Sequence, residues 1–385
     1  MASSIAKLLA VASGSLAVAG IAYTAIAIAR VRRFRAAAAH PSPRSTTPVS
    51  ILKPLFGAEP QLFENLCSFC DQDYPQYQVI FGAADPNDPA LAVARAVKER
   101  FPDREIEIAA GSAAAAGNPK IGNLLGMIGR ARYPLVAIAD SDIRVGRAYL
   151  HTLAGCFDDP RVGAATCIYG GVPNGTAASH LGAMHVNDQF APSVVVAGAL
   201  EPLTYCFGAT MAVRSEVLEL IGGLEALADH LADDYLLGKR VTEAGYRVAL
   251  VPYAVQTCVS DDTLTALWRH EQRWSRAILG QRPAGYAGSI VTYALPFAAA
   301  CAALSPTPFS AAMLMLAATL RVWLHYESRI AFAPQTRATP WLIPLRDVFG
   351  LGVWVSAFFG SRVHWKSDAY RLRPGGRMAV GTQEM

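Results

Sequence analysis

Short apolar runs alternate with stretches of helical periodicity between residues 49 and 142. Runs of continuous apolar residues indicate buried strands, and apolar residues that recur on one helical stripe indicate amphipathic helices. The predicted strands are 49–52, 77–81, 105–108 and 133–139, and the predicted helices between them are 59–70, 90–100 and 121–130. This strict alternation predicts an α/β fold with a doubly wound, mostly parallel sheet.

The alternation continues less regularly in the second half of the chain. Further strands are predicted at 162–169, 207–214 and 246–251, and further helices at 149–157, 215–221, 231–244 and 264–279. Residues 170–200 carry few charges and mix Gly, Ala, Val and Pro, so their pattern favours no particular element.

The N-terminal end of the chain reads as a membrane anchor. Residues 8–29 are uncharged, a length that spans a bilayer, and several arginines follow at once. A cleaved signal peptide is the alternative, but its apolar region would be shorter and its basic residues would come first. The arginines on the C-terminal side of the anchor place the main domain in the cytoplasm.

The C-terminal third predicts further membrane segments. No charged residue occurs in 283–320, and 286–304 and 309–324 are each apolar enough for a short span. Residues 341–359 are also apolar but contain Arg346 and Asp347. A third full span would move the basic tail outside, against the positive-inside bias. Either this last segment is re-entrant or interfacial, which we favour, or one of the two earlier segments is not a span.

These patterns predict five regions. They are an anchor with its basic flank at 1–36, a linker at 37–48, a catalytic domain at 49–282, membrane segments at 283–361 and a basic cytoplasmic tail at 362–385.

Composition narrows the class of protein. Of 385 residues, 52% are hydrophobic and only 17% are charged, which is too apolar for an ordinary soluble enzyme. The net charge is +4 and the basic residues form no long clusters, so nucleic acid is not indicated as a partner. Seven scattered cysteines, an odd number, suit free thiols in a reducing compartment.

Two carboxylates end the predicted strand at 133–139. Asp140 and Asp142 lie one residue apart, and ligands of open α/β sheets bind beyond the carboxyl ends of the strands. Such a pair binds a hard divalent cation, Mn²⁺ or Mg²⁺, which in turn binds phosphate. Acids are common at strand ends, however, so the pair alone does not decide the chemistry.

Other residues fit a nucleotide-sugar donor. Asp85 ends the strand at 77–81 and is placed to accept hydrogen bonds from a base or ribose, although an Asp before Pro also forms turns. Lys120 would add positive charge near the phosphates, and otherwise is a solvated lysine.

Further residues fit an acceptor hydroxyl. Asp233 and Asp234 open a predicted helix, where a carboxylate serves either as a general base or simply as a complement to the helix dipole. Arg273 and Trp274 would neutralise a leaving diphosphate and stack on a sugar or acceptor; the alternative is an interfacial aromatic and basic helix.

The order and spacing of these residues resemble glycosyltransferase family 2, and more closely its ceramide glucosyltransferase branch with the bacterial hopanoid-biosynthesis glycosyltransferases. The resemblance covers nearly the whole chain. The matching segments are 49–55, 65–66, 73–75, 118–120, 140–142, 233–235, 273–274 and 363–365, together with Asp85, Cys206 and Gly208.

The resemblance implies a GT-A fold and roles for single residues. Asp85 would contact the nucleotide, Asp140 and Asp142 the sugar diphosphate and the metal, and Asp234 rather than Asp233 would be the catalytic base. The last motif of the family is Gln/Arg-x-x-Arg-Trp. Its Arg and Trp correspond to Arg273 and Trp274 in this chain, but its first position is His270, a departure from the family.

The implied function is inverting transfer of a hexose, glucose or N-acetylglucosamine, from a UDP-sugar to a hydroxyl of a membrane lipid, ceramide or hopanoid. The implied location is a bacterial inner membrane, crossed more than once, with the catalytic domain in the cytoplasm. One alternative is a processive polysaccharide synthase, which needs more spans for its channel. A non-catalytic membrane scaffold or transporter subunit is another; a transporter would keep its ionisable residues inside the spans, whereas the acids of this chain cluster at the predicted sheet ends.

Overall fold

The structure is a computed structural model that describes residues 2–39, 45–59, 61–111, 114–230 and 232–359, and the backbone of three short strands beyond them. The chain divides into two compact units. The sheet unit comprises Ala36–Tyr169 and Leu200–Cys258. The helical unit comprises Met1–Arg35, Gly170–Ala199 and Val259–Met385. The domain boundaries expected from the sequence remain a prediction.

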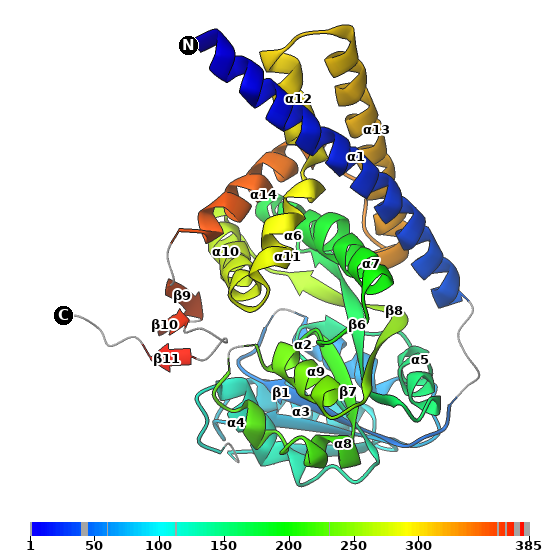
Figure 1. Cartoon of the computed structure of the whole chain (residues 1–385). Helices are drawn as coiled ribbons and strands as arrows, with labels where there is room; N and C mark the ends of the chain where they lie inside the picture. Colours follow the sequence, from blue (N-terminus) through cyan, green and yellow to red (C-terminus); the bar gives the residue numbers. More distant parts are fainter. Residues whose placement is uncertain are drawn as a thin grey trace, which may run out of the picture. The chain divides into compact units, whose positions relative to one another are not determined.

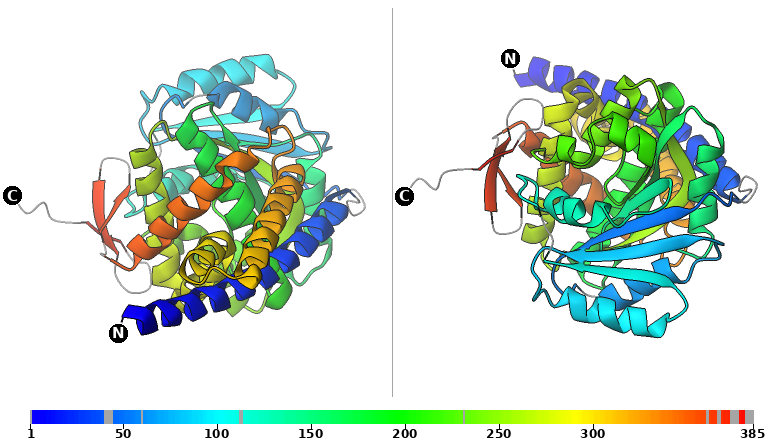
Figure 2. Two further views of the ribbon diagram at one scale, coloured as in Figure 1. Left: turned by 90° about the horizontal axis from the view of Figure 1, so that it is seen from above. Right: turned by 90° about the horizontal axis from the view of Figure 1, so that it is seen from below.

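A mixed sheet organises the sheet unit, and part of it is seen in Figure 2. The sheet has eight strands in the order β3-β2-β1-β4-β7-β6-β8-β5. The first four strands in this order are parallel, and β7 runs antiparallel to both β4 and β6. The strands are β1 (Val49–Leu55), β2 (Tyr77–Ala83), β3 (Glu105–Ala110), β4 (Leu135–Ala139), β5 (Ile143–Arg144), β6 (Val162–Pro173), β7 (Thr210–Arg214) and β8 (Arg247–Val259).

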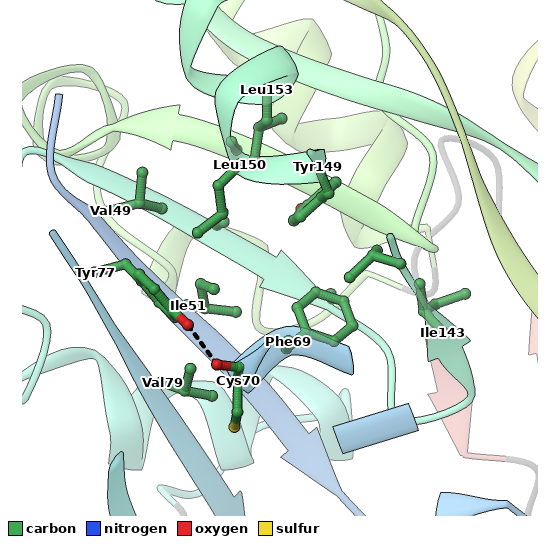
Figure 3. Close-up of a cluster of buried hydrophobic side chains, with 14 of the residues drawn as sticks. Val49, Ile51, Phe69, Cys70, Tyr77, Val79, Ile143, Tyr149, Leu150 and Leu153 are labelled. Carbon is green, nitrogen blue, oxygen red and sulfur yellow. Dashed lines mark hydrogen bonds between the residues drawn. The ribbon is translucent and has the colours of Figure 1, made fainter. Parts of the chain in front are cut away.

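Helices cover both faces of this sheet, which explains why its central strands are apolar on both sides. They are α2 (Leu62–Cys70), α3 (Ala90–Arg100), α4 (Pro119–Ile128), α5 (Tyr149–Gly155), α8 (Ser215–Leu220) and α9 (Asp233–Glu243). Along β1, Val49 and Ile51 enter one core and Leu52 enters the other. Figure 3 shows the first core, in which the Tyr77 hydroxyl donates to the Cys70 carbonyl at 2.6 Å. The doubly wound α/β prediction is therefore confirmed.

The helical unit contains the apolar helices of the chain. They are α1 (Ala2–Ala39), α6 (Ala177–His185), a π-helical segment (Val186–Phe190), α7 (Ala191–Leu200), α10 (Leu264–Gln281), α11 (Pro283–Gly288), α12 (Ala294–Leu304), α13 (Pro308–Phe332) and α14 (Ile343–Ala357). α1, α12 and α13 pack together through small residues such as Ala17, Ala298 and Ala317 (Figure 1). A Cβ on Gly20 would lie 2.7 Å from that of Ala294, so the glycine permits close helix packing.

In the described part of the chain, two helices are long and apolar enough to cross a membrane, Ser4–Ala39 and Pro308–Phe332. They contain the predicted segments 8–29 and 309–324. Residues 286–304, expected as one span, form the pair Pro283–Thr292 and Ala294–Leu304, bent by 60°. This pair is a third candidate only if it counts as a single broken span.

The end of the chain is described in part. Three short strands, β9 (Arg362–Trp365), β10 (Asp368–Leu372) and β11 (Met378–Val380), pair as an antiparallel sheet. The rest of the predicted basic tail at 362–385 lies outside the described residues, as do the side chains of the 363–365 motif.

We expect Gly238→Ala to destabilise the sheet unit by about 1–3 kcal/mol through overpacking. A Cβ at Gly238, on α9, would lie 2.4 Å from Tyr205 Cα and 2.7 Å from Cys206 N, both backbone atoms that do not rotate away. Thermal unfolding of the full chain followed by far-UV circular dichroism measures the loss. Gly129→Ala, where the added Cβ meets nothing within 4 Å, is the matched control. Equal unfolding temperatures for the two variants would contradict this account of α9 packing.

Candidate active site

Lys53 holds the turn that carries Asp140 and Asp142. Its ammonium group is fully buried on β1 and donates to the carbonyls of Asp140 at 2.6 Å and Ile143 at 3.4 Å. Burial lowers the pKa of Lys53 to about 7. Its role was not predicted from the sequence, although a single lysine inside an otherwise apolar strand was the available signal.

Asp142 points into a polar environment that is partly removed from water. Thr257 Oγ1 donates to Asp142 Oδ2 at 2.6 Å. Burial, and next the negative charge of Asp140, raise the pKa of Asp142 to about 6. The native fold therefore disfavours the ionised form of this carboxyl group in the absence of a cation.

Lys120 joins two acidic segments that are distant in the sequence. Its Nζ lies 2.6 Å from Asp140 Oδ1 and 3.7 Å from Asp233 Oδ2. Burial acts to lower the pKa of Lys120, but Asp140 and Asp233 outweigh it and raise the pKa above its ordinary value. Lys120 thus lies beside Asp140, and its predicted role, a positive charge near the donor phosphates, stays a prediction.

Asn118 explains why the starts of α4 and α9 meet. Its side-chain oxygen caps α4 by accepting from the backbone N–H of Lys120 at 3.0 Å. Its side-chain nitrogen donates to the His230 carbonyl at 2.9 Å and to Asp233 Oδ1 at 3.4 Å. One amide therefore caps one helix and fixes the first residue of another.

Asp233 and Asp234 differ in their surroundings. Asp233 is buried and faces Asn118 and Lys120, whereas Asp234 is more accessible. Burial, and next the charge of Asp233, raise the pKa of Asp234 to about 6. A Cβ on Gly208 would lie 3.3 Å from Asp234 Oδ2, so the glycine leaves space beside this carboxylate. Asp234 therefore suits a general base better than Asp233.

Asp85 stands apart from this cluster. It is exposed after β2, and its carboxylate accepts from the backbone N–H of Asn87 at 2.8 Å. Among the described residues, the Asp85 carboxylate makes this hydrogen bond within its own turn and none to the cluster around Lys120. The structure thus brings together Lys120, Asp140 and Asp233, but it links Asp85 to none of them.

His270, Arg273 and Trp274 lie on α10, in the helical unit. His270 Nδ1 is 2.9 Å from Asp261 Oδ2, and the imidazole packs against the Trp274 ring at 4.2 Å between centroids. The next residue, Glu271, is buried and forms a two-bond ion pair with Arg346, each bond 2.7 Å long. His270, which departs from the family motif, is therefore fixed by the carboxylate of Asp261 and the indole ring of Trp274.

Asp140 and Asp142 fit a hard cation by their chemistry. Within the described part of the chain, no group of three or more His, Cys, Asp or Glu side chains is arranged to hold a metal ion. The two aspartates offer oxygen atoms only, and the charge of Asp140 helps to raise the pKa of Asp142. Two carboxylates close enough to influence one another's ionisation suit Mg²⁺ or Mn²⁺, whose other ligands are water and substrate phosphates.

The fold is that of a GT-A glycosyltransferase. A solved mannosyltransferase from Pyrobaculum calidifontis, in complex with GDP-Man and Mn²⁺, has a similar fold. The TM-score is 0.52 at 20% identity, and the match covers 89% of this chain and 99% of the mannosyltransferase.

The chain belongs to glycosyl transferase family 21, which matches residues 13–378. Ceramide glucosyltransferase 3 of Caenorhabditis elegans is 22% identical over 351 residues, which are 86% of this chain and 74% of the relative. Ceramide glucosyltransferase 1 of the same organism is 25% identical over 248 residues, 63% of this chain and 52% of the relative. The protein is therefore a glycosyltransferase.

We expect Asp142→Asn to stabilise the cation-free protein at pH 7.5 but not at pH 3.5. The folded-state pKa of Asp142, about 6, exceeds the ordinary value of 3.8. The stability linked to this group is therefore complete below the ordinary pKa and is lost as the pH rises through about 6. Asparagine keeps the shape without the charge. Unfolding temperatures measured in EDTA at both pH values test this, with Asp262→Asn, at an exposed position, as control. An asparagine variant that is equally stabilised at both pH values would refute the assignment.

Proposed function

We propose that this glycosyltransferase transfers a hexose, glucose or N-acetylglucosamine, from a UDP-sugar to a hydroxyl of a membrane lipid, ceramide or hopanoid, with inversion of the sugar. The observation that carries the proposal is the meeting of Asp140 and Asp233 at Lys120, beside Asp234. This arrangement brings charged groups that suit a donor diphosphate close to a carboxylate that is a candidate general base. The relatives named ceramide glucosyltransferase support a lipid acceptor.

The donor diphosphate would lie against Asp140, Asp142 and Lys120. A divalent cation, Mn²⁺ or Mg²⁺, held by the two aspartates would neutralise diphosphate charge as a Lewis acid. Lys120 contributes a fixed positive charge beside them. Asp85, exposed after β2, is the proposed partner of the uridine base or ribose.

Asp234 is the proposed base. With a pKa of about 6 it is ionised at neutral pH and accepts the proton of the lipid hydroxyl. The hydroxyl oxygen then bonds to the anomeric carbon as the bond from that carbon to the diphosphate breaks, and UDP leaves with the electron pair. One displacement inverts the carbon, and no covalent enzyme intermediate forms, as in inverting glycosidases.

Residues of α10 complete the proposal by resemblance to family 2. Arg273 would offset charge on the leaving UDP and Trp274 would stack on the sugar or the acceptor. His270 occupies the first position of that motif, held by Asp261.

We also propose a multi-pass protein of a bacterial inner membrane, with the sheet unit in the cytoplasm. Arg32 and Arg35, at the C-terminal end of α1, pair with Glu327 near the C-terminal end of α13, at 3.7 and 2.9 Å. The charged ends of these two apolar helices therefore lie at one level. Such a basic end favours the cytoplasmic side. In this topology the bent pair α11 and α12 crosses from the cytoplasm to the opposite side, and α13 then returns the chain to the cytoplasm.

The direct test is transfer by the purified full chain in lipid nanodiscs. UDP-[¹⁴C]glucose or UDP-N-[¹⁴C]acetylglucosamine is supplied with ceramide or a hopanoid polyol, with Mn²⁺, Mg²⁺ or EDTA. We expect a glycolipid carrying one sugar, formed only with a cation. A polymer would indicate a processive synthase instead. Absence of both lipid transfer and donor hydrolysis would contradict the proposal.

We expect Asp234→Asn to lower the transfer rate by about 10²- to 10⁴-fold while UDP-sugar affinity stays unchanged, because only proton removal is lost. In the native enzyme, activity should fall below pH 6, where Asp234 becomes protonated and no longer accepts a proton. Single-turnover rates and equilibrium binding of UDP-sugar measure the two quantities. Glu243→Gln, an exposed position on the same helix, is the control. A near-normal rate for Asp234→Asn would exclude this base.

A further inference from the structure

The turn that carries Asp140 and Asp142 is held from two sides within the sheet unit. On one side, the Asp140 carbonyl accepts from the Ile143 backbone N–H at 3.2 Å and from the buried ammonium of Lys53 at 2.6 Å. On the other side, β5 pairs antiparallel with β8, so that Ile143 lies opposite Thr257. The two carboxylates therefore project from a backbone that has little freedom to rearrange around an ion.

Each of these carboxylates has one oxygen bound to a fixed partner. Asp140 Oδ1 lies 2.6 Å from Lys120 Nζ, and Asp142 Oδ2 accepts from Thr257 Oγ1 at 2.6 Å. In the part of the chain that the structure describes, no hydrogen bond or ion pair reaches Asp140 Oδ2 or Asp142 Oδ1, and both of these oxygens remain accessible. Each aspartate therefore offers a single oxygen atom to an ion.

Two single oxygens on a fixed turn suit some divalent cations better than others. Mg²⁺ and Mn²⁺ bind in octahedral geometry, and one or two carboxylates suffice because water and phosphate supply the other ligands. Ca²⁺ is larger, takes more oxygen ligands, and often binds both oxygens of one carboxylate. To bind Ca²⁺ with both oxygens, Asp142 would have to give up its hydrogen bond from Thr257.

We propose that Thr257 is a positioning residue that selects Mn²⁺ or Mg²⁺ over Ca²⁺ at this turn. Its hydroxyl keeps Asp142 Oδ2 from the ion, so that Asp142 binds through Oδ1 alone. Partners of this kind orient a metal ligand without touching the metal. The presence of a cation at the turn rests on the proposed function. The choice between cations, and its dependence on one hydroxyl of β8, goes beyond that function.

The test is equilibrium binding of Mn²⁺ to the purified full chain in detergent, without donor. Electron paramagnetic resonance measures the free Mn²⁺, and competition by Ca²⁺ gives the Kd of Ca²⁺ at the same place. Binding that Asp142→Asn abolishes is assigned to the turn. Thr257→Val and Thr257→Ala lack the hydroxyl, whereas Thr257→Ser keeps it. Far-UV circular dichroism of each variant ensures that a folded chain is measured.

The expected result is a loss of selectivity in the variants without the hydroxyl. The ratio of the Ca²⁺ Kd to the Mn²⁺ Kd should fall by about 10- to 100-fold in Thr257→Val and Thr257→Ala, the usual effect of removing a partner of a metal ligand. Thr257→Ser should keep the ratio of the wild type. Thr242→Val is the matched control, because the hydroxyl of Thr242 donates to the Lys239 carbonyl at 2.8 Å, on α9, and should leave both Kd values unchanged.

An unchanged ratio in Thr257→Val and Thr257→Ala would overturn the proposal, even if both ions bind more weakly, because a merely loosened turn weakens both alike. A ratio lost in Thr257→Ser as well would also overturn it. Either result leaves the proposed function standing if the wild type binds Mn²⁺ and transfers sugar. Absence of Mn²⁺ binding at Asp142 in the wild type would contradict both. A ratio that depends on Thr257 without any sugar transfer supports the selectivity and contradicts the proposed function instead.

Discussion

The candidate active site of the sheet unit depends on the ion pairs that Lys120 forms with Asp140 and Asp233. Parallel strands and their helices bring Asp140, Asp233 and Asp234 to one region, where three carboxylates would repel one another. The ammonium group of Lys120, 2.6 Å from Asp140 and 3.7 Å from Asp233, offsets this repulsion. Asn118 sets its position by capping α4 and holding Asp233. The site is thus assembled from helix starts and one strand end.

The helical unit contains buried ion pairs between its apolar helices. Its apolar helices bury Arg346 against Glu271 and Arg321 against Asp347, pairs that tie α10 to α14 and α13 to α14. Removing one member of such a pair leaves an uncompensated charge, so these contacts specify how the helices pack. Arg321 also supports Asp188. The same network therefore holds Asp188, which also accepts from His325, inside the helical unit.

The regular part of the chain was predictable because strand and helix periods differ. The helix at 90–100 was predicted with its observed bounds, and the parallel strands lie within a few residues of expectation. Residues 170–200 were not, because Gly, Ala and Val on buried helices leave no polar face to give a period. Their π-helical segment and the 60° bend before Ala294 left no recognisable signal either.

The residue types of the site were predictable from the sequence, but the hydrogen bonds and ion pairs that connect them were not. Asp140, Asp142, Lys120 and Asp234 follow from strand ends and helix starts, and their roles stay predictions. The supports come from segments far along the chain, as with Thr257 on Asp142. The central claim, a single displacement with Asp234 as base, is tested most directly by the anomeric configuration of the glycolipid made from UDP-α-glucose. NMR coupling at the anomeric proton should show a β-linkage; an α-linked product would contradict the account.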